Sequence, residues 1–307
     1  MATPLEKDPT TSCGSSREVD EQVGGTATTA YSWIALEVPK PWGRKALPES
    51  DLPEAVKSHL SNAADELDGG RVLFITRDDR KQPDRYRMYL ARSREGESRL
   101  RLFEFEAYEE LLDIDFSQAI DGRGQVDLTS VDEPVFLFCT NGKRDPCCAR
   151  IGLAAYRSLA DDYPERVWQS SHQGGHRFAG NLIVLPYGVQ YGRVEAHNAD
   201  QIIAATERGE ILLAHYRGRT LYEAPAQAAE YYLRTEHNLR AIDALRLASL
   251  ESGENGRTAV RFEAPSAGDS WQLETQEYTS DYLVFKTTGD EEQAHATRHR
   301  VERAKTI

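Results

Sequence analysis

The sequence predicts a protein of the α/β class that contains two unlike α/β units. Strand-like and helix-like segments alternate along residues 28–128 and again along residues 131–215. The total length of 307 residues corresponds to about two domains of ordinary size. Hydrophobic residues make up 39% of the chain, which is enough to form a buried core in each unit.

The first unit is expected to be a domain over residues 28–128. An apolar segment at 31–38 ends at a Pro/Gly turn and predicts a strand. The helical spacing of apolar residues predicts a helix at 52–67, and three further strands are expected at 71–76, 85–92 and 99–106. Residues 1–27 are rich in Thr, Ser, Gly and acidic residues, so a flexible N-terminal arm that contains Cys13 is expected.

The second unit, residues 131–215, has the element order β-α-β-β-α, which is that of a small thioredoxin-like sandwich. A buried strand at 135–138 runs directly into Cys139. A helix is expected at 149–159, two strands joined by a Pro/Gly turn at 181–185 and 191–194, and a second helix at 199–208. Residues 224–307 are expected to form one long helix over 224–250, three short strands at 260–262, 271–273 and 282–285, and a charged, frayed tail from residue 290.

The charge and hydropathy of the chain exclude several functional classes. With 37 basic and 50 acidic side chains the net charge is −13, so no nucleic-acid partner and no binding to an anionic membrane are expected. No apolar run approaches the roughly 20 residues that span a bilayer. The polar N-terminus lacks the apolar stretch of a signal peptide. We therefore expect a cytoplasmic protein without a membrane span.

The cysteines and two histidines carry the strongest chemical signal. Cys139 and Cys148 enclose eight residues, and a loop of this length folds back to offer two thiolates to one metal centre. His172 and His176 follow in a glycine-rich loop, and glycine permits a close approach to a ligand. Thiolate and neutral imidazole both bind iron and zinc. Two cysteines and two histidines therefore make a complete set of four ligands.

Each part of this set also has a simpler interpretation. Two cysteines nine positions apart are often buried apolar residues, and histidines in a glycine-rich loop often only line a pocket. Because both loops adjoin strand ends of one small unit, metal binding is the favoured interpretation. For each of the other notable side chains, the sequence allows either two interpretations or only one. Arg144 and Asp145 either position the first loop or are solvated, Arg177 lies either at the site or on the surface, Trp168 and Tyr191 are expected in the core, and His295 and His299 are expected on the surface.

The motif Cys139-x8-Cys148 followed by His172-x-Gly-Gly-His176, together with residues 178–194, resembles the sucrase/ferredoxin-like family over about residues 25–215. The resemblance implies a C-terminal thioredoxin-like ferredoxin domain preceded by a divergent α/β N-terminal domain. In fungal relatives the motif holds a [2Fe–2S] cluster, with two cysteines on one iron and two histidines on the other. The family spacing selects Cys148, which leaves the adjacent Cys147 as a spare thiol, although Cys147 is itself an alternative ligand.

By this resemblance, Cys139 and Cys148 would hold the iron that stays ferric, and His172 and His176 the iron that accepts the electron. The expected function is one-electron transfer coupled to proton uptake on imidazole, between an unidentified donor and acceptor. Two alternatives stay open: a cluster-dependent reductase of quinone-like or other small oxidants, and a non-redox protein with a structural Cys2His2 zinc site. A carrier is favoured over an enzyme, and an enzyme of this kind would be an oxidoreductase.

Overall fold

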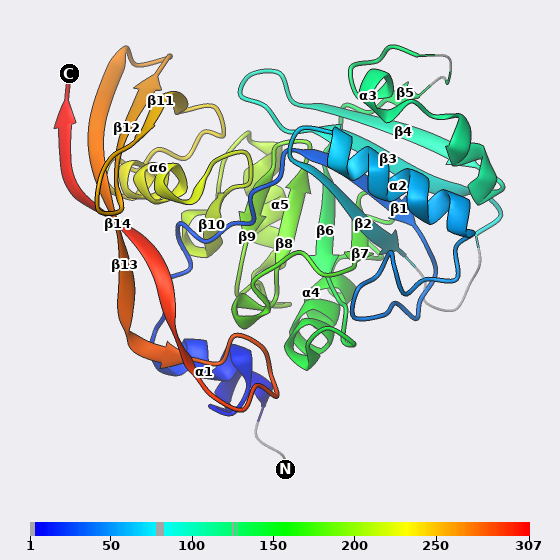
Figure 1. Cartoon of the computed structure of the whole chain (residues 1–307), viewed down its shortest axis with the longest axis horizontal. Helices are drawn as coiled ribbons and strands as arrows, with labels where there is room; N and C mark the ends of the chain where they lie inside the picture. Colours follow the sequence, from blue (N-terminus) through cyan, green and yellow to red (C-terminus); the bar gives the residue numbers. More distant parts are fainter. Residues whose placement is uncertain (1–3, 78–82, 125, 127) are drawn as a thin grey trace.

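The computed structural model is a mixed α/β structure with one large curled sheet and a second, smaller sheet (Figure 1). It describes residues 4–77, 83–124, 126 and 128–307. Within these residues the large sheet has ten strands in the order β10-β9-β8-β6-β7-β2-β1-β3-β4-β5, and the small sheet has the order β11-β12-β13-β14. None of the described helices combines the length and the apolar character needed to cross a membrane.

Residues 28–128 supply the strands of one half of the large sheet. In chain order these elements are β1 (Ser32–Glu37), α2 (Glu54–Glu66), β2 (Gly70–Thr76), β3 (Tyr86–Arg92), β4 (Arg99–Phe105), η2 (Tyr108–Asp113) and α3 (Phe116–Ala119), with the edge strand β5 (Thr129–Ser130) just beyond them. The strands and the helix predicted in this region are confirmed. Strand β1 is buried throughout, because Ile34 and Leu36 pack in the core under α2 while Trp33 and Ala35 pack inside the curled sheet.

Residues 131–215 supply most of the other half. These elements are β6 (Val135–Cys139), the π-helical turn η3 (Cys148–Gly152), α4 (Leu153–Arg157), β7 (Val167–Ser170), η4 (His176–Phe178), β8 (Leu182–Leu185), β9 (Val189–Tyr191), α5 (Ala199–Glu207), η5 (Leu213–His215) and β10 (Tyr216–Arg219). Trp168 and Tyr191 are fully buried, as predicted. Strand β2 pairs antiparallel with β7 through Ile75 and Ser170, so the strands of both units form one continuous sheet.

The region after residue 220 differs from the prediction. It contains α6 (Ala224–Glu236), β11 (Arg246–Ser252), β12 (Arg257–Ala264), β13 (Asp269–Val284) and β14 (Ala294–Thr306). The helix predicted over 224–250 ends at Glu236, because Asn238 adopts a left-handed φ of 50° and the residues beyond pair with β12. The strands predicted near 271 and 282 are one strand, β13.

The charged tail from residue 290 does not fray in the structure. It forms β14, which pairs with β13 from Trp271↔Thr306 to Val284↔Ala294. The long-range backbone pairing orders a sequence whose charged side chains give little local sign of a strand. The β13–β14 hairpin extends from the small sheet down to α1 (Figure 1).

The N-terminal residues also differ from the expected flexible arm, of which residues 1–3 lie outside the described residues. After η1 (Leu5–Lys7) the chain forms α1 (Ser12–Glu18), whose first turn is capped by the Thr11 hydroxyl, which accepts from the Gly14 N–H. Residues Ser12–Ser16 are buried. Small side chains permit this close packing: a Cβ at Gly14 would lie 1.9 Å from the Asp8 carbonyl oxygen.

Candidate metal centre

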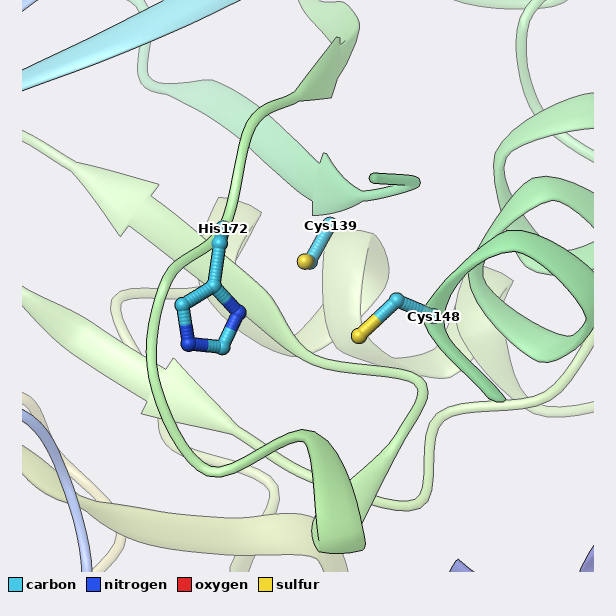
Figure 2. A group of neighbouring side chains, drawn as sticks. All are labelled: Cys139, Cys148 and His172. Carbon is cyan, nitrogen blue, oxygen red and sulfur yellow. The ribbon is translucent and has the colours of Figure 1, made fainter. Parts of the chain in front are cut away.

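Three of the four predicted ligands meet at one edge of the large sheet. Cys139 ends β6, Cys148 opens η3, and His172 lies in the loop after β7. Because β6 and β7 are parallel neighbours with Cys139 opposite Ser170, their carboxyl ends deliver Cys139 and the histidine loop to the same place. The two sulfurs and one ring nitrogen of His172 all lie within 4.8 Å of one another. In Figure 2 the imidazole nitrogen that faces the sulfurs is Nδ1.

A glycine allows the two cysteines to approach each other. Cys139 and Cys148 are both fully buried and both are free thiols. A Cβ at Gly152 would lie 2.0 Å from the Cys139 carbonyl oxygen, so only glycine permits η3 to sit so close to the end of β6. The Cys148 side chain therefore points from η3 toward Cys139 (Figure 2).

The two thiols are electrostatically unequal. The hydrogen bond from Cys148 holds the pKa of Cys139 well below its usual range, and His172 lowers this pKa further. The same hydrogen bond, together with burial, raises the pKa of Cys148 well above its usual range. The pair therefore favours a thiolate on Cys139 that accepts a hydrogen bond from the Cys148 thiol. A thiolate is the form of cysteine that binds metals.

His176 lies next to this group but is not one of the three residues whose donor atoms meet within 4.8 Å among the described side chains. Its ring centroid is 5.1 Å from that of His172. The His176 Nε2 atom lies 3.1 Å from Thr287 Oγ1 and 3.8 Å from the Asp145 carboxylate. Burial lowers the pKa of His176, and the Asp145 charge opposes this shift.

The Nδ1 atoms of both histidines are buried, and neither has a hydrogen-bond partner in the part of the chain that the structure describes. A buried polar atom without a partner is unfavourable, and a metal ion or ligand bound at these nitrogens would remove that penalty. The Nδ1 atom of His172 faces the two sulfurs (Figure 2). Two thiols and two unpartnered imidazole nitrogens are a donor set that suits iron or zinc.

The glycines between the histidines adopt the backbone conformations predicted for them. Gly174 has a φ of 95° and Gly175 a φ of 66°, which other residues rarely adopt. Neither position has room for a side chain, since a Cβ would lie 2.3 Å from Thr28 Oγ1 or 2.4 Å from Arg217 Nη2, respectively. The loop thus turns tightly between its two imidazoles.

Asp145 positions the first ligand loop and is not solvated. It is 1% exposed, and its carboxylate accepts hydrogen bonds from the Cys147 N–H, the Ser12 hydroxyl, and the N–H and hydroxyl of Thr288. These donors belong to the first ligand loop, α1 and the β13–β14 hairpin. Of the two interpretations that the sequence allowed for Asp145, the structure supports positioning of the loop.

Cys147 is neither a spare thiol nor a ligand in the structure. It forms a disulfide with Cys13 of α1, with a Cα–Cα distance of 6.2 Å. The bond fixes α1 beside the candidate ligand Cys148. Arg177, which the sequence placed either at the site or on the surface, pairs with the buried Glu21 at 2.9 Å. His295 and His299, both expected on the surface, lie on the ordered strand β14. His295 is exposed as expected, whereas the His299 side chain is only 13% exposed.

Several side chains around the candidate centre were not predicted from the sequence. Thr287 and Thr288 come from the β13–β14 hairpin, and Ser12 comes from α1. They are separated from the ligand loops by more than a hundred residues of chain, and no local pattern marks them. Asp145 lies inside the motif, and its position before Pro146 indicates a turn but not burial.

The fold and the site together define a mixed α/β protein with two buried cysteines and a partly buried histidine, a group of metal-ligand type, at one edge of its large sheet. A family model described as sucrase/ferredoxin-like matches residues 23–218. The chain therefore belongs to the sucrase/ferredoxin-like family, as the resemblance implied.

One similar protein is the altered inheritance of mitochondria protein 32 of the yeast Meyerozyma guilliermondii. The two sequences are 26% identical over 121 residues, which is 34% of this chain and 43% of the yeast protein. The chain thus spans less than half of the length of that relative. No solved structure matches the chain.

Proposed function

We propose that the protein is an electron-transfer protein that holds a [2Fe–2S] cluster through Cys139, Cys148, His172 and His176. The observation that carries the proposal is the convergence of two buried thiols and a histidine Nδ1, beside a second histidine whose Nδ1 is also buried without a partner among the described residues. The proposal includes a thioredoxin-like arrangement of residues 131–215, as the family resemblance implies.

The residues fit such a cluster. Cys139 and Cys148 would bind as thiolates, so the proton that they share would leave when the site is loaded. The unpartnered Nδ1 atoms of His172 and His176 would be the metal-binding nitrogens. A bound cluster would supply one-electron redox chemistry, at a potential above that of a cluster with four cysteines, because imidazole is neutral.

The second nitrogen of His176 is the candidate proton site. With Nδ1 as the metal-binding atom, Nε2 is left to hold a proton and to donate it to Thr287 Oγ1 at 3.1 Å. The Asp145 carboxylate, 3.8 Å away, favours the protonated ring. Added negative charge at the centre raises the affinity of this nitrogen for its proton.

We therefore predict that the midpoint potential falls as the pH rises, because the proton taken up with the electron becomes scarcer. One proton per electron gives a slope of up to about 59 mV per pH unit. The measurement is a redox titration of the purified protein at several pH values. A potential that is constant from about pH 6 to 9 would contradict the proton coupling.

The proposed function is tested by anaerobic purification followed by iron, sulfide and zinc analysis. We expect a red-brown protein with two iron and two sulfide ions per chain, whose visible absorption bleaches on addition of dithionite. A colourless protein with one zinc ion per chain would overturn the proposal in favour of a structural zinc site. Assay of the loaded protein with a panel of quinones and a reductant distinguishes a carrier from a reductase.

A further inference from the structure

Two arginines from different strands hold the backbone of the histidine loop. Arg71 of β2 donates from Nη2 to the His172 carbonyl oxygen at 3.0 Å. Arg217 of β10 donates from Nη1 to the Gly174 carbonyl oxygen at 3.1 Å. One guanidinium therefore binds the first histidine of the H-x-G-G-H segment, and the other binds the turn between the two histidines.

Arg217 lies directly beneath this loop. The guanidinium fills the space where a side chain at Gly175 would be, since a Cβ there would lie 2.4 Å from Nη2. Its Nη1 also donates to Asn181 Oδ1 at 2.6 Å, and the Asn181 amide donates to the Gly175 carbonyl oxygen at 3.0 Å. The arginine and the asparagine together fix the carbonyls of both glycines.

The charge of Arg217 has no carboxylate partner within ion-pair distance among the described residues. Its side chain is 2% exposed, and its remaining hydrogen bonds go to the hydroxyl and carbonyl oxygens of Thr26. Burial lowers the pKa of Arg217 to about 9, so the guanidinium is still charged at neutral pH. A buried charge without a countercharge is strongly unfavourable.

Two groups supply negative charge that acts on Arg217 from beyond ion-pair distance: the buried Glu21 carboxylate and the candidate centre. Negative charge on Cys139 acts on both arginines, since it opposes the lowering of the pKa of Arg217 and of Arg71 by burial. Arg71 is partly buried, and it too donates a hydrogen bond to the histidine loop. Both cations therefore lie beside the candidate centre, whose charge would become more negative on reduction.

We infer that Arg71 and Arg217 are positioning residues that hold the histidine loop in its ligating conformation and provide buried positive charge that favours the reduced centre. This inference rests on the proposed [2Fe–2S] function. A fixed cation close to a redox centre stabilises the more negative, reduced form and so raises the midpoint potential.

The test compares four variants of the full-length protein: Arg71→Gln, Arg71→Lys, Arg217→Gln and, as a control, Arg261→Gln. Arg261 is exposed on β12 of the small sheet, so its replacement makes the same change in net charge away from the centre. The readouts are iron and sulfide content, circular dichroism and the midpoint potential at one pH, with dithionite as the reductant.

We expect both Gln variants of the pair to have a lower midpoint potential than the wild type. Arg71→Lys keeps the charge, so its potential should lie between those of Arg71→Gln and the wild type, and Arg261→Gln should match the wild type. A folded Arg71→Gln chain that loses iron, while Arg71→Lys retains it, equally supports the positioning role. If Arg217→Gln does not fold, the Arg71 pair decides the question.

One outcome would overturn the proposed function, and a different outcome would overturn only the inference about the arginines. Wild-type protein without iron and sulfide overturns the proposed function itself. Wild-type protein that carries a cluster, combined with an Arg71→Gln variant of unchanged potential and full iron content, overturns the inference about the arginines and leaves the proposed function intact.

Discussion

At the scale of single residues, neighbouring cysteines of the first ligand loop have different roles. Cys147 is bonded to Cys13, whereas the Cys148 thiol faces Cys139. On the proposed function Cys148 is a cluster ligand, so we predict that Cys148→Ala loses the iron of the purified protein. We expect Cys147→Ser to keep its iron. Iron analysis of the two variants checks this, and loss of iron from Cys147→Ser would reverse the choice of ligand.

Asp145 is the residue that connects the ligand loop to the two segments that cover it. Replacement by Asn keeps the shape but turns one acceptor oxygen into a donor, which then faces the groups that donate to it. We predict that Asp145→Asn lowers the free energy of unfolding by about 1–3 kcal/mol. Urea denaturation measures the change, and Asp281→Asn, at an exposed position of the same hairpin, is the matched control.

At the scale of elements, α1 is tied to the candidate centre by one covalent bond across a sequence separation of 134 residues. Because a crosslink over so long a loop restricts the unfolded chain, we predict that Cys13→Ser lowers the free energy of unfolding by about 2–4 kcal/mol. Hydrogen exchange of residues 12–18 should become faster in the variant.

The control for this prediction is chemical reduction. A thiol reductant should lower the free energy of unfolding of the wild type. It should leave that of Cys13→Ser unchanged, since the variant has no crosslink to lose. Peptide mapping without reduction should recover Cys13 and Cys147 in one linked pair. Recovery of both cysteines as free thiols would contradict the pairing.

The elements differ in whether the sequence alone predicts them. Strands such as β1 and β6 and the helix α2 were predictable, because each carries its own apolar pattern within a few residues. The motif spacing and the family resemblance indicated Cys139, Cys148 and His172, whose side chains converge in the structure. Strand β14 and helix α1 were not predictable, because their order depends on other segments: β14 pairs with β13, and α1 is bonded to the first ligand loop 134 residues away.

At the scale of the whole molecule, buried histidines make the stability depend on pH. Burial lowers the pKa of His176, His215 and His299 below the ordinary value. The unfolded chain therefore binds more protons than the folded chain just below the ordinary pKa of about 6.5. We predict full stability above this pH and a loss of stability as the pH falls below it.

This dependence is measured by urea denaturation at a series of pH values between about 7.5 and 5.5, a range that brackets the ordinary pKa of histidine. His215 lies apart from the candidate ligands, with its Nε2 atom 3.2 Å from the Asn198 amide nitrogen. A His215→Gln variant should show a shallower loss of stability than the wild type over this range. An equal slope in the two proteins would argue against a contribution of His215.

The β13–β14 hairpin has a consequence for the order in which the protein matures during synthesis. The ligand loops lie between residues 139 and 176, whereas Thr287 and Thr288, which contact His176 and Asp145, lie more than a hundred residues later. The ribosome therefore releases all four candidate ligands well before the segment that covers them. If the protein carries the proposed cluster, the metal would be delivered most easily after the histidine loop has emerged and before the hairpin closes over it.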